Sequence, residues 1–288
     1  ELLKPIRSIV LTRQLAERQK EGSVDVIDLV ASRVGHSVHA AAEISWTEYR
    51  EQAFENLGLP KSLVDNLNIN PDTPSKDNSN DIYIERRYVR KIGDYQVSGK
   101  FDFVVSGVVE DIKTTKTYNW INGSNDKKYA QQGSIYRWIV PQIITEDYCN
   151  IHYTFTDWKQ HLMYGAPDYP SSPIKTRKLP LMSLEDTETF IKNVINKINS
   201  LMNVEQTELP QCTTEELWMN PSTWKWFKGG KVTARSTKNF PSYSEAVTHA
   251  GGVGLIVEHK ANAKRCLYCE AMPVCTQAAQ LQSENRIG

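Results

Sequence analysis

Residues 101–113 read FDFVVSGVVEDIK. Two runs rich in valine and phenylalanine flank Ser106-Gly107, a pattern typical of a β-hairpin with a two-residue turn. If Val105 pairs with Val108, the numbers of any two opposed residues sum to 213. Side chains alternate along a strand, so one face of the hairpin is predicted to be apolar core, formed by Phe101, Phe103, Val105, Val108 and Ile112.

The same register places Asp102 opposite Asp111, on the other face of the hairpin. Opposed residues have Cβ atoms about 4.5–5.5 Å apart, so the two carboxylates repel each other. A divalent cation turns this repulsion into a binding site, because Mg²⁺ favours one or two carboxylates together with water and phosphate. Lys113 shares the face of Asp111, while Glu110 points the other way. The competing interpretation is that Lys113 only neutralises Asp111 in an exposed hairpin.

The segments around the hairpin predict a chain of mixed α/β class. A helix that follows a hairpin and returns to a further strand is typical of a mixed central sheet flanked by helices. Hydrophobic periodicity and turn residues predict helices within 24–57, 126–140 and 183–203, an exposed loop at 66–81, and strands at 82–90, 95–105, 108–113 and 148–156.

Composition excludes several classes of protein. Hydrophobic residues make up 40% of the 288 residues and charged residues 24%, so a sizeable core can form. The formal net charge is zero, which excludes a polybasic mode of nucleic-acid binding but leaves local basic patches open. No apolar run approaches the roughly 20 residues that cross a bilayer, and the first residues lack a signal-peptide core. We therefore expect a cytoplasmic protein that does not associate with membranes.

Four of the five cysteines predict a metal site near the C-terminus. Three lie close together, at Cys266, Cys269 and Cys275, and the remote Cys212 is the best candidate for a fourth ligand, with His249 or His259 the next candidates. An all-sulfur site suits either a [4Fe–4S] cluster or Zn²⁺. Cys149 lies in a strand-like run and is expected to be an ordinary buried thiol.

With Cys212 as the ligand, the metal would clamp a C-terminal subdomain and not join the two ends of the chain. We accordingly expect a core over residues 1–205 and a metal-clamped subdomain over 206–288.

A basic stretch lies inside this expected subdomain. Residues 225–238 contain five bases, no acid and two aromatic residues, a combination that suits a DNA strand because cations contact phosphates and rings stack on bases. A solvated charged surface is the alternative. The candidate DNA-binding residues are Lys225, Lys228, Lys231, Arg235 and Lys238.

Taken together, these motifs resemble the RecB-like branch of the PD-(D/E)XK nuclease superfamily. Asp102 followed by Asp111-Ile112-Lys113 is similar to the D…DxK signature, although Phe101 stands where that signature has proline. Residues 35–43, GHSVHAAAE, resemble the GxxxHxxxE motif, and Gln132 to Tyr136 resembles the QxxxY motif. The cysteine cluster resembles that of AddB-type, CRISPR-associated and free-standing phage-type exonucleases, but the lone cysteine in those families precedes the nuclease core.

This resemblance implies a restriction-endonuclease-like core and a Mg²⁺- or Mn²⁺-dependent DNA exonuclease. His39, Asp102 and Asp111 would hold the metal, Lys113 would assist hydrolysis, and Gln132 and Tyr136 would contact DNA or orient the site. Glu43 and Glu85 are further candidates as auxiliary acids, and the cysteine pattern implies [4Fe–4S] more than zinc.

The expected partner is DNA, as single strands or duplex ends, in end processing, recombination or replication. A recombination protein or a single-strand-binding protein is a candidate protein partner. Two alternatives remain: a catalytically idle DNA-binding or scaffold module of the same fold, and a structure-specific endonuclease.

Overall fold

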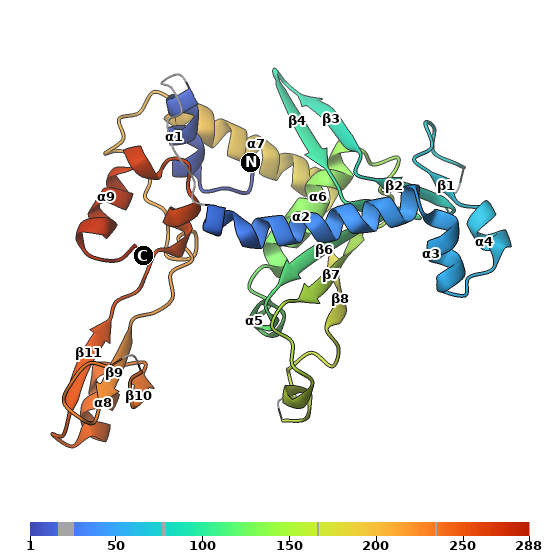
Figure 1. Ribbon diagram of the computed structural model, residues 1–288. Coiled ribbons are helices and arrows are strands. Elements are labelled where there is room, and N and C mark those ends of the chain that lie inside the picture. The colour runs from blue at the N-terminus through green and yellow to red at the C-terminus, as the bar shows by residue number, and fades with distance from the viewer. Residues whose placement is uncertain (17–25, 77–78, 166, 234, 288) are drawn as a thin grey trace. The chain divides into compact units, whose positions relative to one another are not determined.

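The computed structural model describes residues 1–16, 26–76, 79–165, 167–233 and 235–287 (Figure 1). The chain divides into two compact units, and one is inserted into the sequence of the other: Gly22–Asn193 forms the inserted unit, while Glu1–Glu21 and Val194–Gly288 form the second. The expected boundary lay between residues 205 and 206, whereas the observed units divide the chain near residues 21 and 193. The N-terminal helix α1 (Ile6–Ala16) belongs to the C-terminal unit because its Val10 and Leu11 pack with Leu209 and Ala271.

The inserted unit is built around a six-stranded mixed sheet of order β1-β2-β5-β6-β7-β8. Neighbours β1/β2 and β6/β7 are parallel, and the other pairs are antiparallel. The strands of this sheet are β1 (Asn68–Ile69), β2 (Asp81–Ile84), β5 (Phe103–Val105), β6 (Val108–Thr115), β7 (Tyr148–Phe155) and β8 (Ile174–Pro180). A separate two-stranded sheet pairs β3 (Arg87–Ile92) with β4 (Tyr95–Lys100).

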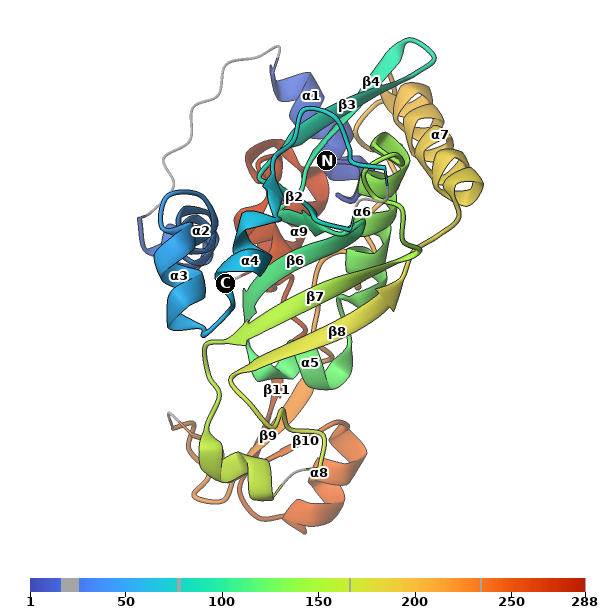
Figure 2. The same cartoon turned by 90° about the vertical axis from the view of Figure 1, so that its right-hand side faces the viewer.

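Helices cover both faces of the six-stranded sheet (Figures 1 and 2). Ala42 and Trp46 of α2 pack on one face, against Phe103 and Ile112. On the other face α6 packs against β7 so closely that a Cβ at Gly133 would meet the Cys149 side chain. The helices of this unit are α2 (Val26–Thr47), α3 (Arg50–Asn56), α4 (Lys61–Asp65), α5 (Thr117–Asn122), α6 (Asp126–Ile139), the 3-10 helix η1 (Gln160–Tyr164) and the start of α7 (Leu184–Leu201).

The observed register of the central hairpin is the predicted one, because Val105 pairs with Val108, Val104 with Val109 and Phe103 with Glu110. The predicted core face is confirmed, because Phe101, Phe103 and Val108 are buried and Val105 and Ile112 pack against the core around Phe103. The opposite face of the hairpin is buried as well. Val104 and Val109 are buried together with Phe103 and Val108, since β5 and β6 are interior strands covered on both faces. The predicted helices at 126–140 and 183–203 and the strand at 148–156 correspond to α6, α7 and β7.

Two predicted strands are each interrupted. The 82–90 segment breaks between β2 and β3 at Glu85 and Arg86, and the 95–105 segment breaks between β4 and β5 at Phe101 and Asp102. Glu85 has a φ of 52°, in the left-handed region, and its amide donates to the carbonyl of Asp102 at 2.9 Å. The hairpin of β3 and β4 therefore bends out of the six-stranded sheet at Glu85 and Asp102.

The predicted loop at 66–81 is also partly wrong. Asn68 and Ile69 form β1, which pairs with β2. Asp81 is buried, and its carboxylate accepts hydrogen bonds from the Asn68 side chain and the Ser75 amide. These bonds fix the polar segment to the edge of the sheet.

The turn at Ser106-Gly107 gives a stability prediction. Both residues have positive φ, and a Cβ at Gly107 would overlap Thr145 Oγ1. The backbone strain of Gly107→Ala costs about 1–2 kcal/mol, and the overlap adds to it, so we expect the free energy of unfolding to fall by about 3 kcal/mol. Gly58→Ala is the matched control, because Gly58 also has positive φ but has nothing within 4 Å of its Cβ position. Equal losses for the two variants in urea denaturation would contradict the close approach to Thr145.

The second unit contains a three-stranded sheet of order β10-β9-β11, covered on one face by α8. Trp226, Phe240, Ala246 and Ala250 form its small core. Its elements beyond α1 and the end of α7 are β9 (Thr223–Phe227), β10 (Lys238–Phe240), α8 (Tyr243–Ala250), β11 (Leu255–His259), the 3-10 helices η2 (Lys264–Tyr268) and η3 (Met272–Val274), and α9 (Thr276–Ser283). Throughout the described residues, each helix is too short or too polar to cross a bilayer.

Candidate functional site

The first part of the candidate site lies where the chain breaks between β4 and β5. Asp102 stands just outside β5, so its side chain no longer follows the alternation of the strand. Its Oδ1 lies 3.2 Å from Nδ1 of His39 on α2, and its Oδ2 accepts a hydrogen bond from the amide of Ile112 at 3.0 Å. The expectation that Asp102 and Asp111 face each other as paired strand residues therefore needs correction, because Asp102 turns towards α2.

Glu85 joins His39 and Asp102 at this point. One potential ligand atom from each residue lies within 4.8 Å of the other two, and among the described histidines, cysteines and acids only this trio gathers so closely. The Glu85 carboxylate is also ion-paired with Lys100. The strand pattern had indicated Glu85 only as an auxiliary acid, because the left-handed turn that brings it to Asp102 has no signal in the sequence.

Asp111 and Lys113 lie beside this trio on β6. The Lys113 Nζ is 2.5 Å from Oδ2 of Asp111, and it also lies 5.3 Å from the centre of the Tyr129 ring on α6. Asp111 is 4% exposed, and apart from this ion pair its Oδ2 has no hydrogen-bond partner among the described residues. Glu110 points away, as predicted, and contacts His152 and Asn150.

The local environment shifts the pKa values of these groups. Burial by itself raises the pKa of Asp102, but the hydrogen bonds from His39 and the Ile112 amide outweigh it, so that this pKa lies below its usual value. The same hydrogen bond to Asp102 raises the pKa of His39. Burial raises the pKa of Asp111, against the opposing charge of Lys113. The site thus stabilises the Asp102 carboxylate as an anion, whereas burial makes the anion of Asp111 unfavourable unless a cation lies beside it.

An open cavity of about 660 Å³ connects these residues to solvent. Its wall includes residues from α2, from the β2–β3 and β4–β5 breaks, and from β6. The predicted residues His39, Glu43, Glu85, Asp102 and Lys113 all line it, together with Gly35 and His36. Asp111 lies behind Lys113, buried in the sheet.

Gln132 and Tyr136 lie one turn apart on α6. The Gln132 Nε2 donates a hydrogen bond to the Tyr136 Oη at 2.8 Å, which leaves the phenol proton available as a donor. Burial raises the pKa of Tyr136 to about 12, and the negative charges of Asp111, Asp102 and Glu85 add to the rise. The Tyr136 ring packs edge-on against Phe101, next to Asp102.

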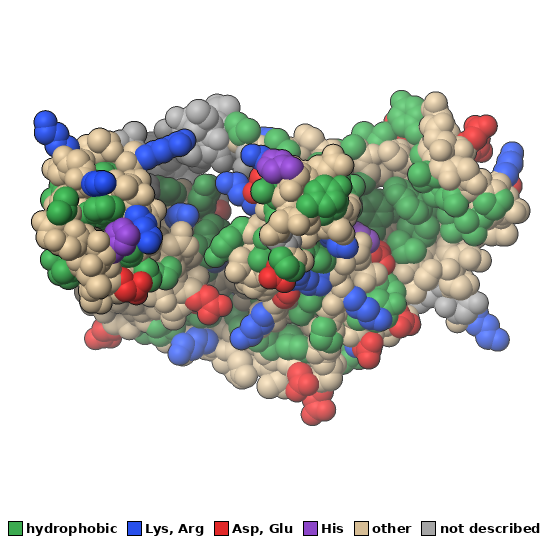
Figure 3. Space-filling model, turned by 90° about the horizontal axis from the view of Figure 1, so that it is seen from below, with side chains coloured by type: hydrophobic (Ala, Val, Ile, Leu, Met, Phe, Trp, Pro, Cys, Tyr) green, Lys and Arg blue, Asp and Glu red, His purple; other side chains and the backbone are tan. Residues whose placement is uncertain are grey.

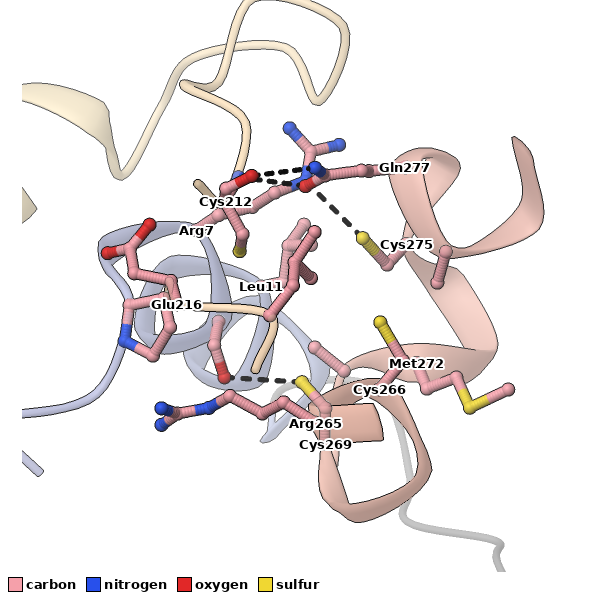
Figure 4. A pocket seen from close by; sticks show the side chains of 15 residues that line it. Arg7, Leu11, Cys212, Glu216, Arg265, Cys266, Cys269, Met272, Cys275 and Gln277 are labelled. Carbon is pink, nitrogen blue, oxygen red and sulfur yellow. Dashed lines mark hydrogen bonds between the residues drawn. The ribbon is translucent and has the colours of Figure 1, made fainter. Parts of the chain in front are cut away.

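The four predicted cysteines line one pocket of the second unit (Figure 4). The sulfur atoms of Cys212, Cys266, Cys269 and Cys275 approach a common space from different sides (Figure 4). The side chain of Gln277 fixes the Cys212 backbone through hydrogen bonds to its amide and its carbonyl. Neither His249 nor His259 lines this pocket, and the His249 ring instead packs against Trp226 and Phe240.

Helix α1 contributes to the cysteine pocket, which the sequence did not indicate. The Arg7 Nε donates to Cys275 Sγ at 3.3 Å, and the Ser8 hydroxyl lies 3.3 Å from Cys269 Sγ. Arg7 is 3% exposed and also donates to the carbonyl of Leu209 and to the hydroxyl of Thr276. The N-terminal helix therefore packs at the pocket, although the predicted subdomain over 206–288 did not include it.

Comparisons with known proteins identify no family for the chain. No family model matches it, and no curated protein matches it. Two crystal structures resemble part of it. The protein SSO0001 is 18% identical, with a TM-score of 0.29 and coverage of 70% of this chain and 89% of the other. A protein from Eubacterium rectale with the provisional name of exonuclease is 12% identical, with a TM-score of 0.33 and coverage of 70% and 80%. At these TM-scores and identities, neither structure assigns a fold or an activity to this chain.

The predicted DNA-binding stretch lies in the second unit, on β9, β10 and the loop between them. Lys225 is half-buried on the central strand, while the other four bases, Lys228, Lys231, Arg235 and Lys238, are exposed. The Lys238 Nζ lies 5.1 Å from the centre of the Phe240 ring. These residues form a basic edge of the small sheet and belong to a different unit from the acidic cavity.

The geometry predicts which glutamate binds a metal. Glu85→Gln removes a carboxylate from the trio, so we expect Mn²⁺ affinity to fall about tenfold or more. Glu43→Gln is the control, because Glu43 lines the same cavity but lies outside the trio. Calorimetric titration of both variants with Mn²⁺ checks this. A larger loss for Glu43→Gln would show that the other auxiliary acid is the ligand.

Proposed function

We propose that the chain is a metal-dependent deoxyribonuclease whose inserted unit is a RecB-like PD-(D/E)XK core. One observation carries the proposal: His39, Glu85 and Asp102 gather within 4.8 Å beside the Asp111–Lys113 ion pair, on the wall of an open cavity. The arrangement combines potential metal ligands with a lysine aimed at the same space. A merely structural hairpin does not require both.

The residues present fit a divalent cation. Two carboxylates and an imidazole suit Mg²⁺ or Mn²⁺. Asp111 could also take part, since its buried Oδ2 has only Lys113 as a described partner. When bound, the cation would supply a Lewis acid and lower the pKa of a nearby water.

The protein's own groups have separable roles. Lys113 would place a positive charge where negative charge develops on the scissile phosphate, and Asp111 would hold the ammonium in position. The Gln132 side chain would orient Tyr136, whose free phenol proton could then donate to a phosphate oxygen. The Ile112 amide would hold the Asp102 carboxylate in place.

Exonuclease activity on DNA ends is the favoured mode, and it rests on the resemblance of the motifs. A direct test compares end-labelled linear DNA, as single strand and as duplex, with covalently closed single-stranded circles. We expect linear DNA to be degraded with Mg²⁺ or Mn²⁺ and left intact with EDTA, while the circles survive. Cleavage of the circles would identify an endonuclease instead. Tight DNA binding without cleavage in either metal would identify an idle module.

We further propose that the cysteine pocket holds a [4Fe–4S] cluster with a structural role. Its four sulfurs fit a soft metal centre. No three of them lie within 4.8 Å of one another among the described residues, a wider spacing than the about 3.8 Å expected between thiolates on one zinc ion with Zn–S bonds near 2.3 Å. The spacing therefore supports the larger group over Zn²⁺.

A further inference from the structure

The β3–β4 hairpin leaves the six-stranded sheet (Figure 1). Lys100, the last residue of β4, lines the acidic cavity. Its register is regular, with Arg87 opposite Lys100, Val89 opposite Ser98 and Lys91 opposite Gln96. Opposed residues share a face, and side chains alternate along each strand. The hairpin therefore has one face that carries these six residues and another formed by the residues between them.

The inner face of the hairpin packs on α6. A Cβ at Gly99 would lie 2.8 Å from the Tyr136 ring, and the Arg90 guanidinium lies 4.3 Å from the centre of the Trp138 ring. Val97 is 7% exposed, and Tyr88 stacks on Phe101. These contacts hold the hairpin in a fixed orientation and leave its outer face turned away from the helix.

The outer face carries positive charge only. Arg87, Lys91 and Lys100 are exposed on it, and it contains no acid. The chain as a whole has a net charge of zero, and on the surface seen in Figure 3 cationic and acidic side chains are interspersed. A face that served only solubility would mix both signs in the same way. Lys100 has an acidic partner in Glu85, but Arg87 and Lys91 form no ion pair with a described residue, and these two cations require a different explanation.

This row of cations begins at the cavity. Lys100 lines the cavity and is ion-paired with Glu85, a member of the candidate metal trio. Arg87 lies opposite Lys100 and donates a hydrogen bond to Ser98. Lys91 lies four residues farther along β3, about 13 Å at 3.3 Å per residue, and makes no ion pair with any described residue.

We propose that the outer face of the β3–β4 hairpin binds the phosphate backbone of a nucleic-acid strand and leads it to the cavity. A 13 Å row matches about four phosphates of one strand of a duplex, whose charges follow one another every 3.4 Å along the helix axis. The contacts would be independent of base sequence, because lysine and arginine contact the backbone there. The inference rests on the proposed nuclease function for its substrate and adds a binding surface that neither the cavity nor the 225–238 stretch provides.

Equilibrium binding of the full chain to a fluorescent 20-nucleotide strand and to the matching duplex tests the proposal, in EDTA and over a series of salt concentrations. For Arg87→Gln/Lys91→Gln we expect affinity to fall about tenfold and the salt slope to drop by about 1.4 with single strands or about 1.8 with duplex. The form of DNA, single-stranded or duplex, for which the affinity falls more is the form that the hairpin prefers.

Two further variants keep this test independent of folding. Lys61→Gln/Lys76→Gln removes two exposed lysines elsewhere in the same unit and should change neither affinity nor slope. Val89→Lys adds a cation between Arg87 and Lys91, where Val89 is 54% exposed, and should tighten binding and steepen the slope by about 0.7. Unchanged binding in both hairpin variants, or equal competition by polyglutamate of matched charge, would overturn the proposal.

The same preparations separate this inference from the proposed function. If the wild type cleaves DNA while the hairpin variants bind it with unaltered affinity and slope, the hairpin is not a binding surface and the nuclease stands. If binding depends on the hairpin but no metal supports cleavage, the hairpin surface stands and the nuclease fails. A wild type that binds no DNA would overturn the hairpin proposal.

Discussion

Replacing Lys113 by methionine should reduce metal-dependent DNA cleavage about 100- to 1,000-fold, the range seen when one group that stabilises transition-state charge is removed. The Lys113 ammonium lies 2.5 Å from Asp111 and lines the cavity, so its loss removes a positive charge that no carboxylate of the metal trio neutralises, whereas Lys100 is paired with Glu85. Methionine keeps most of the side-chain volume, which preserves packing against Tyr129. Initial rates on end-labelled linear DNA, measured with saturating Mn²⁺, give the size of the effect.

Lys116→Met is the matched control, because Lys116 is exposed just beyond β6 and outside the cavity. It should retain wild-type rates. Asp111→Asn gives a second test, since it keeps the shape of the buried side chain while leaving Lys113 without its carboxylate. Full cleavage by a folded Lys113→Met protein would exclude this lysine from the reaction and favour a purely neutralising role.

Replacing Cys212 by alanine should remove the metal of the second unit, from about four irons per chain to less than one if the site is a [4Fe–4S] cluster. Cys212 is remote in sequence from the other three cysteines, so its bond to the metal would close a long loop and make binding energy part of the folding energy of this unit. Amide hydrogen exchange should then speed up across residues 212–275 before it changes in the sheet that holds Asp111.

Iron and zinc content, together with the visible absorption of protein purified without oxygen, measure this effect. Cys149→Ala is the control, because Cys149 is fully buried against α6 and lies outside the cysteine pocket. One zinc and no colour in the wild type would reject the iron–sulfur cluster but retain the clamp. Full metal retention in Cys212→Ala would show that another group supplies the fourth ligand.

The sequence predicted what local patterns determine. The Ser106-Gly107 turn sets the register of β5 and β6, and apolar periodicity locates α6 and α7. The same patterns could not reveal the breaks at Glu85 and Asp102, because both segments remain strand-like through these residues. The break between β4 and β5 turns Asp102 towards His39, and the break between β2 and β3 brings Glu85 into the site. Uninterrupted strands would do neither.

Contacts between residues that are distant in the sequence could not be predicted either. Nothing in the α1 sequence indicates that Arg7 and Ser8 contact cysteines, since Arg7 and Cys275 are 268 positions apart. The buried state of Val104 and Val109 depends likewise on helices covering both faces of the sheet. In each case a distant segment, and not a local preference, determines the environment of the residue.

The discontinuous unit has a consequence for the order of events during synthesis. Helix α1 emerges from the ribosome before the inserted unit, but the residues that cover its Val10 and Leu11 include Leu209 and Ala271, which follow that unit. At 5–20 residues per second, the 268 positions between Arg7 and Cys275 take roughly 15–50 s to translate. The inserted unit is contiguous and can fold within that delay, whereas α1 must wait with its apolar side exposed. Incorporation of the proposed metal at the cysteines would therefore be among the last steps of maturation, after the segments that pack on α1 have been made.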